Sequence, residues 1–234
     1  AHQVLANRGE LLAHRIEDAA GRRLGFDEDW LLRNGLPSEA LHDVRWHTAD
    51  WPTPTRLLED GDQIRWGPLD LQVVWCPGHT RGLVCLFEPR RGLLFTTDHV
   101  MRRAPAPVTV REPGAADPLG DYLVSVRKLA PLRVSTVLPG HGRPFGDLGS
   151  RLTAIEADIE AQLDNLRKRL SAGPASAYEL LAVKGLRDRR SVAERYALSL
   201  VLARLRHLEV RGEIVRADRG TAIRYARYSS PGSS

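Results

Sequence analysis

The spacing of apolar residues along the chain changes at two points, near residues 56 and 149. Before the first point, apolar residues recur every three or four positions behind a short apolar run at 4–6. This spacing predicts a strand followed by helices over 7–19, 27–34 and 37–44. Capping residues support these limits, because Asn7 can begin the first helix and Gly35 can end the second.

Between the two points the pattern is that of strands. Apolar residues from Arg56 to Trp75 alternate with polar ones around glycine turns, which predicts a β-meander. Further strands are predicted over 83–87, 93–96 and 134–138, with an amphipathic helix over 121–129. The first part of the chain is therefore expected to be a mixed α/β domain.

Helical spacing returns after Gly149. It predicts helices over 152–170, 177–183 and 191–207, and then a β-hairpin made by 213–216 and 222–225. Three helices followed by a hairpin is the order of elements in a winged helix. The pattern thus predicts an α/β domain over 1–148, a small α+β winged-helix domain over 149–228, and a disordered tail at 229–234.

The composition is that of a soluble globular protein, with 42% apolar and 27% charged residues among 234. The sequence has no run of 18 apolar residues and no basic-then-apolar signal pattern at its start, so we expect neither a membrane span nor secretion. Cys76 and Cys85 lie in apolar strand-like runs, which favours buried reduced thiols. These features predict a cytoplasmic protein without a membrane partner.

Positive charge is concentrated in the C-terminal third. Residues 151–234 contain 16 Lys and Arg against 10 Asp and Glu, whereas residues 1–150 contain 18 against 19. A basic module can bind an anionic partner such as RNA. A solvated, arginine-rich helical surface explains the same excess, and the sequence leaves the two interpretations open.

Candidate metal ligands follow three of the predicted strands. They lie in Pro77-Gly78-His79-Thr80, Thr97-Asp98-His99 and Pro139-Gly140-His141-Gly142. Imidazole and carboxylate groups suit zinc, and also iron or manganese. A strand end fixes the backbone that carries each group, and glycine allows a tight turn there. We therefore expect His79, Asp98 and His141 to converge on one point.

These motifs resemble, in order and spacing, the last three metal motifs of the metallo-β-lactamase superfamily. Residues 117–123 are similar to a stretch of bacterial members, and the winged helix is similar to one appended to a hydrolase and endoribonuclease branch. The resemblance implies an αββα sandwich, here incomplete at its N-terminus, with two metal ions at one sheet edge. It also implies that His79 binds the first ion, Asp98 bridges both and His141 binds the second, with no catalytic residue beyond these ligands.

The sequence departs from the family pattern at several positions. The family's first metal motif, His-x-His-x-Asp-His, does not occur in it. Thr97 stands where a glycine usually precedes the aspartate, and Arg81 and Leu83 differ from the residues that usually follow Gly-His-Thr. Either the chain is a fragment, which we favour, or it is a degenerate homologue. In both cases we expect the chain alone to bind metal weakly and to be inactive.

The resemblance implies a metal-dependent hydrolase, with zinc as the expected metal, in which an activated water attacks a thioester, ester or lactam. A small molecule is the expected substrate. Two alternatives stay open. One is an RNA-processing endoribonuclease of the same fold, and the other is a non-catalytic binding or regulatory homologue. The sequence identifies neither the substrate-binding residues nor the oligomeric state.

Overall fold

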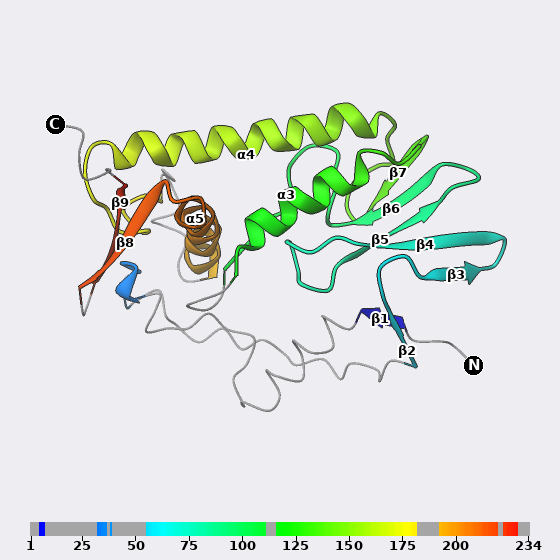
Figure 1. Cartoon of the computed structure of the whole chain (residues 1–234), viewed down its shortest axis with the longest axis horizontal. Helices are drawn as coiled ribbons and strands as arrows, with labels where there is room; N and C mark the ends of the chain where they lie inside the picture. The colour runs from blue at the N-terminus through cyan, green and yellow to red at the C-terminus, as the bar shows by residue number, and fades with distance from the viewer. Residues whose placement is uncertain are drawn as a thin grey trace. The chain divides into compact units, whose positions relative to one another are not determined.

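Figure 1 shows the computed structural model of the chain, which describes residues 5–7, 32–36, 38, 55–110, 116–181, 192–219 and 222–228. The predicted helix over 37–44, almost all of the one over 7–19, and the tail at 229–234 lie outside these residues. The described end of the second predicted helix stops at Gly35, whose φ is +92°. This left-handed conformation terminates a helix, as the sequence predicted.

The chain forms two compact units. The first contains residues 1–23, 47–108 and 120–159, and the second contains residues 24–46, 109–119 and 160–234. Residues 24–46 and 109–119 precede the predicted domain boundary at 148, yet they belong to the same unit as the C-terminal residues. Hydrogen bonds within the second unit account for this grouping. The Tyr225 hydroxyl donates to the Asn34 side chain at 3.0 Å, and the Ser199 hydroxyl donates to the Val110 carbonyl.

A five-stranded sheet forms the framework of the first unit. Its strands lie in the order β3 (Gln63–Trp66), β4 (Leu69–Trp75), β5 (Val84–Glu88), β6 (Leu93–Thr97) and β7 (Thr136–Pro139). Neighbours from β3 to β6 are antiparallel, whereas β7 runs parallel to β6. The predicted strands and the mixed α/β class are therefore confirmed.

One part of the predicted meander is wrong. The segment β2 (Arg56–Leu58) does not join the five-stranded sheet but pairs in parallel with β1 (Leu5–Asn7). Leu58 packs in a buried cluster with Ile64, Leu71 and Val73. Leu58 continues the alternating apolar pattern of the meander. It contributes to the core from the β1–β2 pair and not from a further strand of the five-stranded sheet.

Helix α3 (Pro118–Leu129) begins three residues earlier than predicted. Proline favours the first helical position, because its fixed φ suits the helix and its missing N–H is not needed there. Buried apolar side chains recur along one face of α3 every three or four residues, at Leu119, Tyr122, Val126 and Leu129. Burying each of them stabilises the fold by about 1.5–3 kcal/mol. Figure 1 shows α3 beside the sheet.

Strand direction brings three loops to one edge of the sheet. Because β4 and β6 are both antiparallel to β5, and β7 is parallel to β6, the strands β4, β6 and β7 share one direction. The residues that follow these strands therefore leave the sheet at the same edge. Each of the three candidate ligand motifs comes directly after one of them.

The second unit contains the C-terminal part of α4 (Leu148–Leu170), helix α5 (Val192–Val210) and the antiparallel hairpin of β8 (Ile214–Arg219) and β9 (Ala222–Arg227). These elements confirm the predicted first and third helices and the hairpin. No helix in the described part of the chain is long and apolar enough to cross a membrane.

The predicted helix over 177–183 is wrong as far as residue 181, the last one described before 192. Residues 177–180 form turns, although Ser176 and Glu179 make the reciprocal contacts of a capping box. The Ser176 amide donates to a Glu179 carboxylate oxygen at 2.7 Å, and the Glu179 amide donates to the Ser176 hydroxyl at 3.2 Å. Between these two residues, the Tyr178 amide donates to the Asn34 carbonyl at 3.0 Å, so this turn is held by a segment distant in the sequence.

Candidate metal centre

The structure brings the three predicted ligands together at the edge where β4, β6 and β7 end. His79 Nε2 lies 3.7 Å from Asp98 Oδ2, and His141 Nε2 lies 3.4 Å from Asp98 Oδ1. The Asp98 carboxylate thus stands between two imidazoles, with one oxygen facing each ring. The sequence-based expectation that these groups converge agrees with this geometry.

The separations suit a shared cation better than direct hydrogen bonds. An N–H···O bond is usually about 2.7–3.2 Å long, so both contacts exceed that range. Two ligand atoms that are each about 2.1 Å from a tetrahedral ion lie roughly 3.4 Å apart. The nitrogen and oxygen atoms around Asp98 therefore have the chemistry and approximate spacing of metal donors.

A backbone contact indicates which ring nitrogen of His79 carries a proton. Its Nδ1 lies 2.7 Å from the Pro107 carbonyl oxygen, and because a carbonyl can only accept, Nδ1 must carry the proton. In the neutral ring Nε2 then directs a lone pair toward the Asp98 carboxylate. Two acceptors that face each other repel, and a cation between them would turn this repulsion into attraction. Histidines that bind metals commonly donate their other ring nitrogen in this way.

Glycine at position 140 leaves room for Asp98. A Cβ atom there would lie 2.8 Å from Asp98 Oδ1 and 3.0 Å from the Thr97 carbonyl carbon. The Gly140 amide also donates to the Thr97 carbonyl oxygen at 2.6 Å. The close approach of the β6 and β7 ends, and with it the His141–Asp98 contact, therefore depends on the missing side chain.

Thr97 holds an unusual backbone conformation directly before Asp98. Its φ is +46°, in the left-handed region that β-branched residues rarely adopt. The register between β6 and β7 shifts at the same place, between Phe95 and Thr97. The Thr97 side chain therefore strains the turn that directs Asp98 toward the two imidazoles. The metallo-β-lactamase pattern usually has glycine at this position.

His99 follows Asp98 but lies apart from this group. Its side chain is fully buried, and its ring meets the edge of the Tyr122 ring with centroids 4.9 Å apart. Burial, together with the charge of the nearby His79, lowers the pKa of His99 from 6.5 to about 4. The ring is therefore neutral at pH 7 and serves as part of the core.

The donor set is partial. In the described stretches of the chain, no group of three or more His, Cys, Asp or Glu side chains is close enough to enclose a metal ion by itself. Cys76 and Cys85 are buried free thiols, and burial raises the pKa of Cys85, so it stays protonated. His2, His14, His42 and His47 lie outside the described residues. His79, Asp98 and His141 thus fit a metal ion as part of a larger ligand set.

The sequence did not indicate the role of the loop over 100–108. Its Pro107 carbonyl orients His79, but a backbone oxygen leaves no side-chain signal in a sequence. Its proline-rich composition is typical of a loop but does not show which groups the loop contacts.

Comparison with known proteins identifies the family of the chain. The profile of the Metallo-beta-lactamase superfamily matches residues 8–141. An acyl-coenzyme A thioesterase, MBLAC2 of Gallus gallus, is 36% identical over 102 residues, which cover 40% of this chain and 33% of the relative. The probable metallo-hydrolase YqjP of Bacillus subtilis is 32% identical over 101 residues, 42% of this chain and 30% of the relative. The matches thus span about a third of these relatives.

Solved structures extend the similarity to nearly the whole chain. A β-lactamase domain protein from Burkholderia ambifaria superposes with a TM-score of 0.78 at 28% identity, covering 97% of this chain and 65% of its own. A metallo-β-lactamase family protein from Thermus thermophilus gives 0.76 at 26% identity, covering 97% and 72%. The three motifs, the strand ends that carry them and these similarities agree, and the chain belongs to the metallo-β-lactamase superfamily.

Proposed function

We propose that the chain is part of a metal-dependent hydrolase in which His79 ligates one ion, Asp98 bridges two ions and His141 ligates the second. Zinc is the proposed metal, and iron or manganese suit the same donors. The observation that carries this proposal is the position of the Asp98 carboxylate between the two imidazoles, with a different oxygen facing each ring.

Bound metal would supply a water of lowered pKa and polarise the bond to be cleaved. The chain's own residues prepare the site for it. Pro107 keeps the His79 proton on Nδ1, which leaves Nε2 free to donate its lone pair. The turn at Thr97 aims the carboxylate, and Gly140 lets the His141 loop approach it.

A thioester is the proposed substrate, because relatives of this chain include acyl-coenzyme A thioesterases. Esters and lactams remain secondary candidates. We also propose that residues 149–228 form a winged-helix domain, which the succession of α5 and the β8–β9 hairpin supports. Further ligands for the two ions would have to come from residues outside the described stretches or from additional chain.

RNA cleavage receives less support from the second unit. Several of its arginines are paired with carboxylates and so add little free positive charge. Arg167 contacts Glu213 at 2.6 Å, Arg211 contacts the same Glu213 at 2.6 Å, and Arg224 lies 3.1 Å from Glu179. The basic excess of the C-terminal third is thus partly neutralised within the unit, as expected for a solvated helical surface.

Zinc titration of the chain tests the proposed ligands. We expect weak binding in the wild type, and binding weakened by more than about tenfold in Asp98→Asn, because even outer-shell partners of a metal contribute ten- to hundredfold. Asp70→Asn is the matched control, since Asp70 begins β4 at the opposite edge and pairs with surface arginines. Equal zinc affinity in Asp98→Asn and the wild type would contradict the proposal. Tight stoichiometric zinc with rapid thioester turnover would contradict the partial ligand set.

A further inference from the structure

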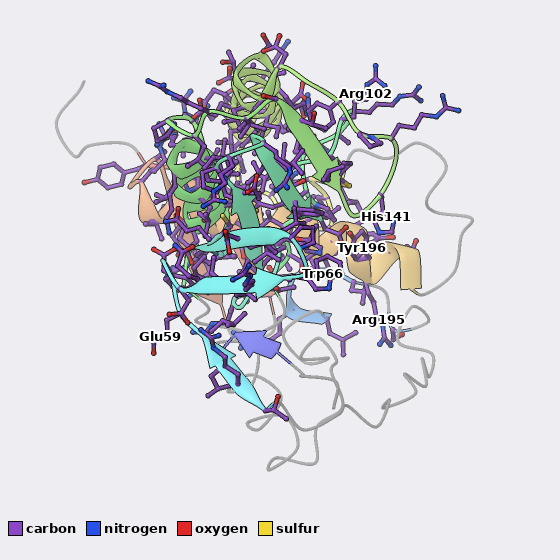
Figure 2. All side chains as sticks on the ribbon, turned by 90° about the vertical axis from the view of Figure 1, so that its right-hand side faces the viewer. Glu59, Trp66, Arg102, His141, Arg195 and Tyr196 are labelled. Atoms are coloured by element: carbon purple, nitrogen blue, oxygen red, sulfur yellow. The ribbon has the colours of Figure 1, made fainter. Side chains whose placement is uncertain are left out.

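Four exposed arginines occupy the loops around the candidate metal centre. Arg81 follows His79, Arg102 and Arg103 follow Asp98, and Arg143 follows His141. All four leave the sheet at the edge shared by β4, β6 and β7. We call these four residues the arginine rim. Figure 2 shows Arg102 and His141 on the same side of the first unit.

The loop that carries Arg102 and Arg103 is closed and anchored at its base. Val100 and Pro105 form a β-bridge beneath its tip, and Val100 is fully buried. The Arg151 side chain donates to the Met101 carbonyl at 2.7 Å. Further along, the same loop supplies the Pro107 carbonyl that orients His79. The two guanidinium groups are therefore presented from a fixed base that is tied to the metal ligands.

A second closed loop carries Arg143. Val137 and Phe145 exchange two backbone hydrogen bonds, of 2.7 and 3.1 Å, so residues 138–144 form a loop that projects from the end of β7. His141 lies on this loop two residues before Arg143. The arginine rim thus shares its supporting backbone with two of the three candidate ligands.

The charges of the arginine rim are not balanced locally. Within the described stretches, none of its four guanidinium groups forms an ion pair with a carboxylate. The opposite edge of the same sheet differs, because Arg91 lies 3.4 Å from Glu88 and Arg90 lies 3.8 Å from Asp70. Several unpaired arginines at one edge create a positive local potential that attracts anions.

We propose that the arginine rim binds the phosphate groups of the substrate, so that the substrate class is an acyl thioester whose thiol part carries a phosphorylated nucleotide. This inference rests on the proposed function. Guanidinium groups bind phosphate oxygens with two parallel hydrogen bonds and retain their charge at all relevant pH values. The four arginines act as specificity and positioning residues, and they take no part in bond cleavage.

Calorimetric titration of the metal-free chain with coenzyme A and with pantetheine, which lacks the nucleotide and its phosphates, tests the proposal. We expect the wild type to bind coenzyme A more tightly than pantetheine. The double variant Arg102→Ala, Arg103→Ala should bind coenzyme A at least about tenfold more weakly, since loss of each charge-assisted contact to a phosphate costs about 1.4 kcal/mol or more. Its weak affinity for pantetheine should not change.

Arg133→Ala is the matched control, because Arg133 is an exposed arginine that precedes β7 and so lies at the opposite edge. It should leave coenzyme A affinity within about twofold. The double lysine variant Arg102→Lys, Arg103→Lys keeps the charge but loses the bidentate geometry, and we expect an intermediate affinity. Raising the salt concentration should weaken coenzyme A binding in the wild type and have less effect in the alanine variant.

Three outcomes would overturn the proposal. The first is equal affinity of the wild type for coenzyme A and pantetheine, and the second is an equal effect of Arg133→Ala and the double alanine variant. The third is binding of a single-stranded RNA, but not of coenzyme A, through Arg102 and Arg103. The titration contains no metal, so it is independent of the zinc measurement. Coenzyme A binding without any zinc binding would contradict the hydrolase and leave the phosphate site standing.

Discussion

The Asp98 carboxylate reaches two imidazoles because Thr97, directly before it, turns the chain through a conformation that costs energy. Non-glycine residues at positive φ are destabilised by roughly 1–2 kcal/mol, and a β-branched side chain adds to the crowding. The Thr97 side chain is exposed and not required for packing. The site therefore contains strain that a smaller residue would remove.

We expect Thr97→Gly to raise the free energy of unfolding by about 1 kcal/mol, since relief of the left-handed strain outweighs the greater flexibility of glycine in the unfolded chain. Urea-induced unfolding of both proteins measures the difference. The control is Thr136→Gly in β7, where φ is not positive and the same exchange should destabilise by about 1 kcal/mol. Destabilisation of equal size at both positions would show that the Thr97 turn carries no strain.

The ligand positions could be predicted from the sequence, because each histidine follows glycine at the end of an apolar run and each strand end fixes its direction. The groups that contact and orient these ligands could not be predicted from the sequence. The Pro107 carbonyl that orients His79 belongs to a loop with no periodic pattern. Sequence also cannot show that Gly140 is needed because Asp98 lies where its side chain would be.

Helix α3 contacts the loop beside the candidate centre through one hydroxyl group. Tyr122 on α3 is fully buried, and burial raises its pKa to about 12. Its hydroxyl donates to the His99 carbonyl at 3.0 Å and accepts from the Ala106 amide at 3.1 Å. It therefore holds both ends of the loop that carries Arg102 and Arg103.

We expect Tyr122→Phe to destabilise the first unit by about 1–3 kcal/mol, because a buried carbonyl and a buried amide lose their partner. Hydrogen exchange should become faster at the Ala106 amide, which identifies the loop as the site of the change. Tyr228→Phe is the control, since that side chain is 54% exposed and its change should have little effect. Unchanged exchange at Ala106 would mean that the hydroxyl does not restrain the loop.

Elements with a strong periodic pattern were predictable and elements defined by long-range contacts were not. The strands from β3 to β7, helix α5 and the hairpin follow their apolar spacing. The sequence pattern extends the meander to Leu58, but the pairing of β2 with β1 places this segment in another sheet, from which Leu58 packs on Ile64 and Leu71. Likewise, Ser176 and Glu179 have the spacing of a helix cap, but the turn between them is held by the Asn34 carbonyl, which accepts from the Tyr178 amide.

At the scale of the whole molecule, a cluster of ion pairs stabilises the second unit. Arg167 on α4 bonds Glu213 at 2.6 Å and also contacts Glu160 and Asp164, at 2.6 and 2.7 Å. Its side chain is only 18% exposed. The hydrogen bond from Arg167 is the main reason that the pKa of Glu213 lies below 4.5 in the folded protein.

We expect stability to fall in acid through this cluster. A carboxyl group whose pKa is lowered on folding contributes stability above its unfolded pKa of 4.5, and this contribution is lost as the pH falls through the lower, folded value. Arg167→Met should therefore destabilise by about 1–3 kcal/mol at pH 7 and by less at pH 3. Denaturant midpoints at the two pH values measure the difference.

Arg65→Met is the control for this prediction, because Arg65 is 81% exposed and lies 4.0 Å from Asp70. Pairs of this kind contribute little, so its midpoints should match those of the wild type at both pH values. An equal loss at pH 7 and pH 3 in Arg167→Met would show that packing of the arginine side chain, rather than its charge, stabilises the unit.

Each of the two units is built from three separate segments of the chain, and this affects how one unit could be expressed alone. A cut at residue 148, which the sequence pattern favours, would separate Asp117 from its partner His207, 2.7 Å away, and Val110 from Ser199. Neither product of such a cut would retain all of its native neighbours. Expression of one unit alone requires excision of inner segments and rejoining of the ends, because no single cut separates the residues of one unit from those of the other.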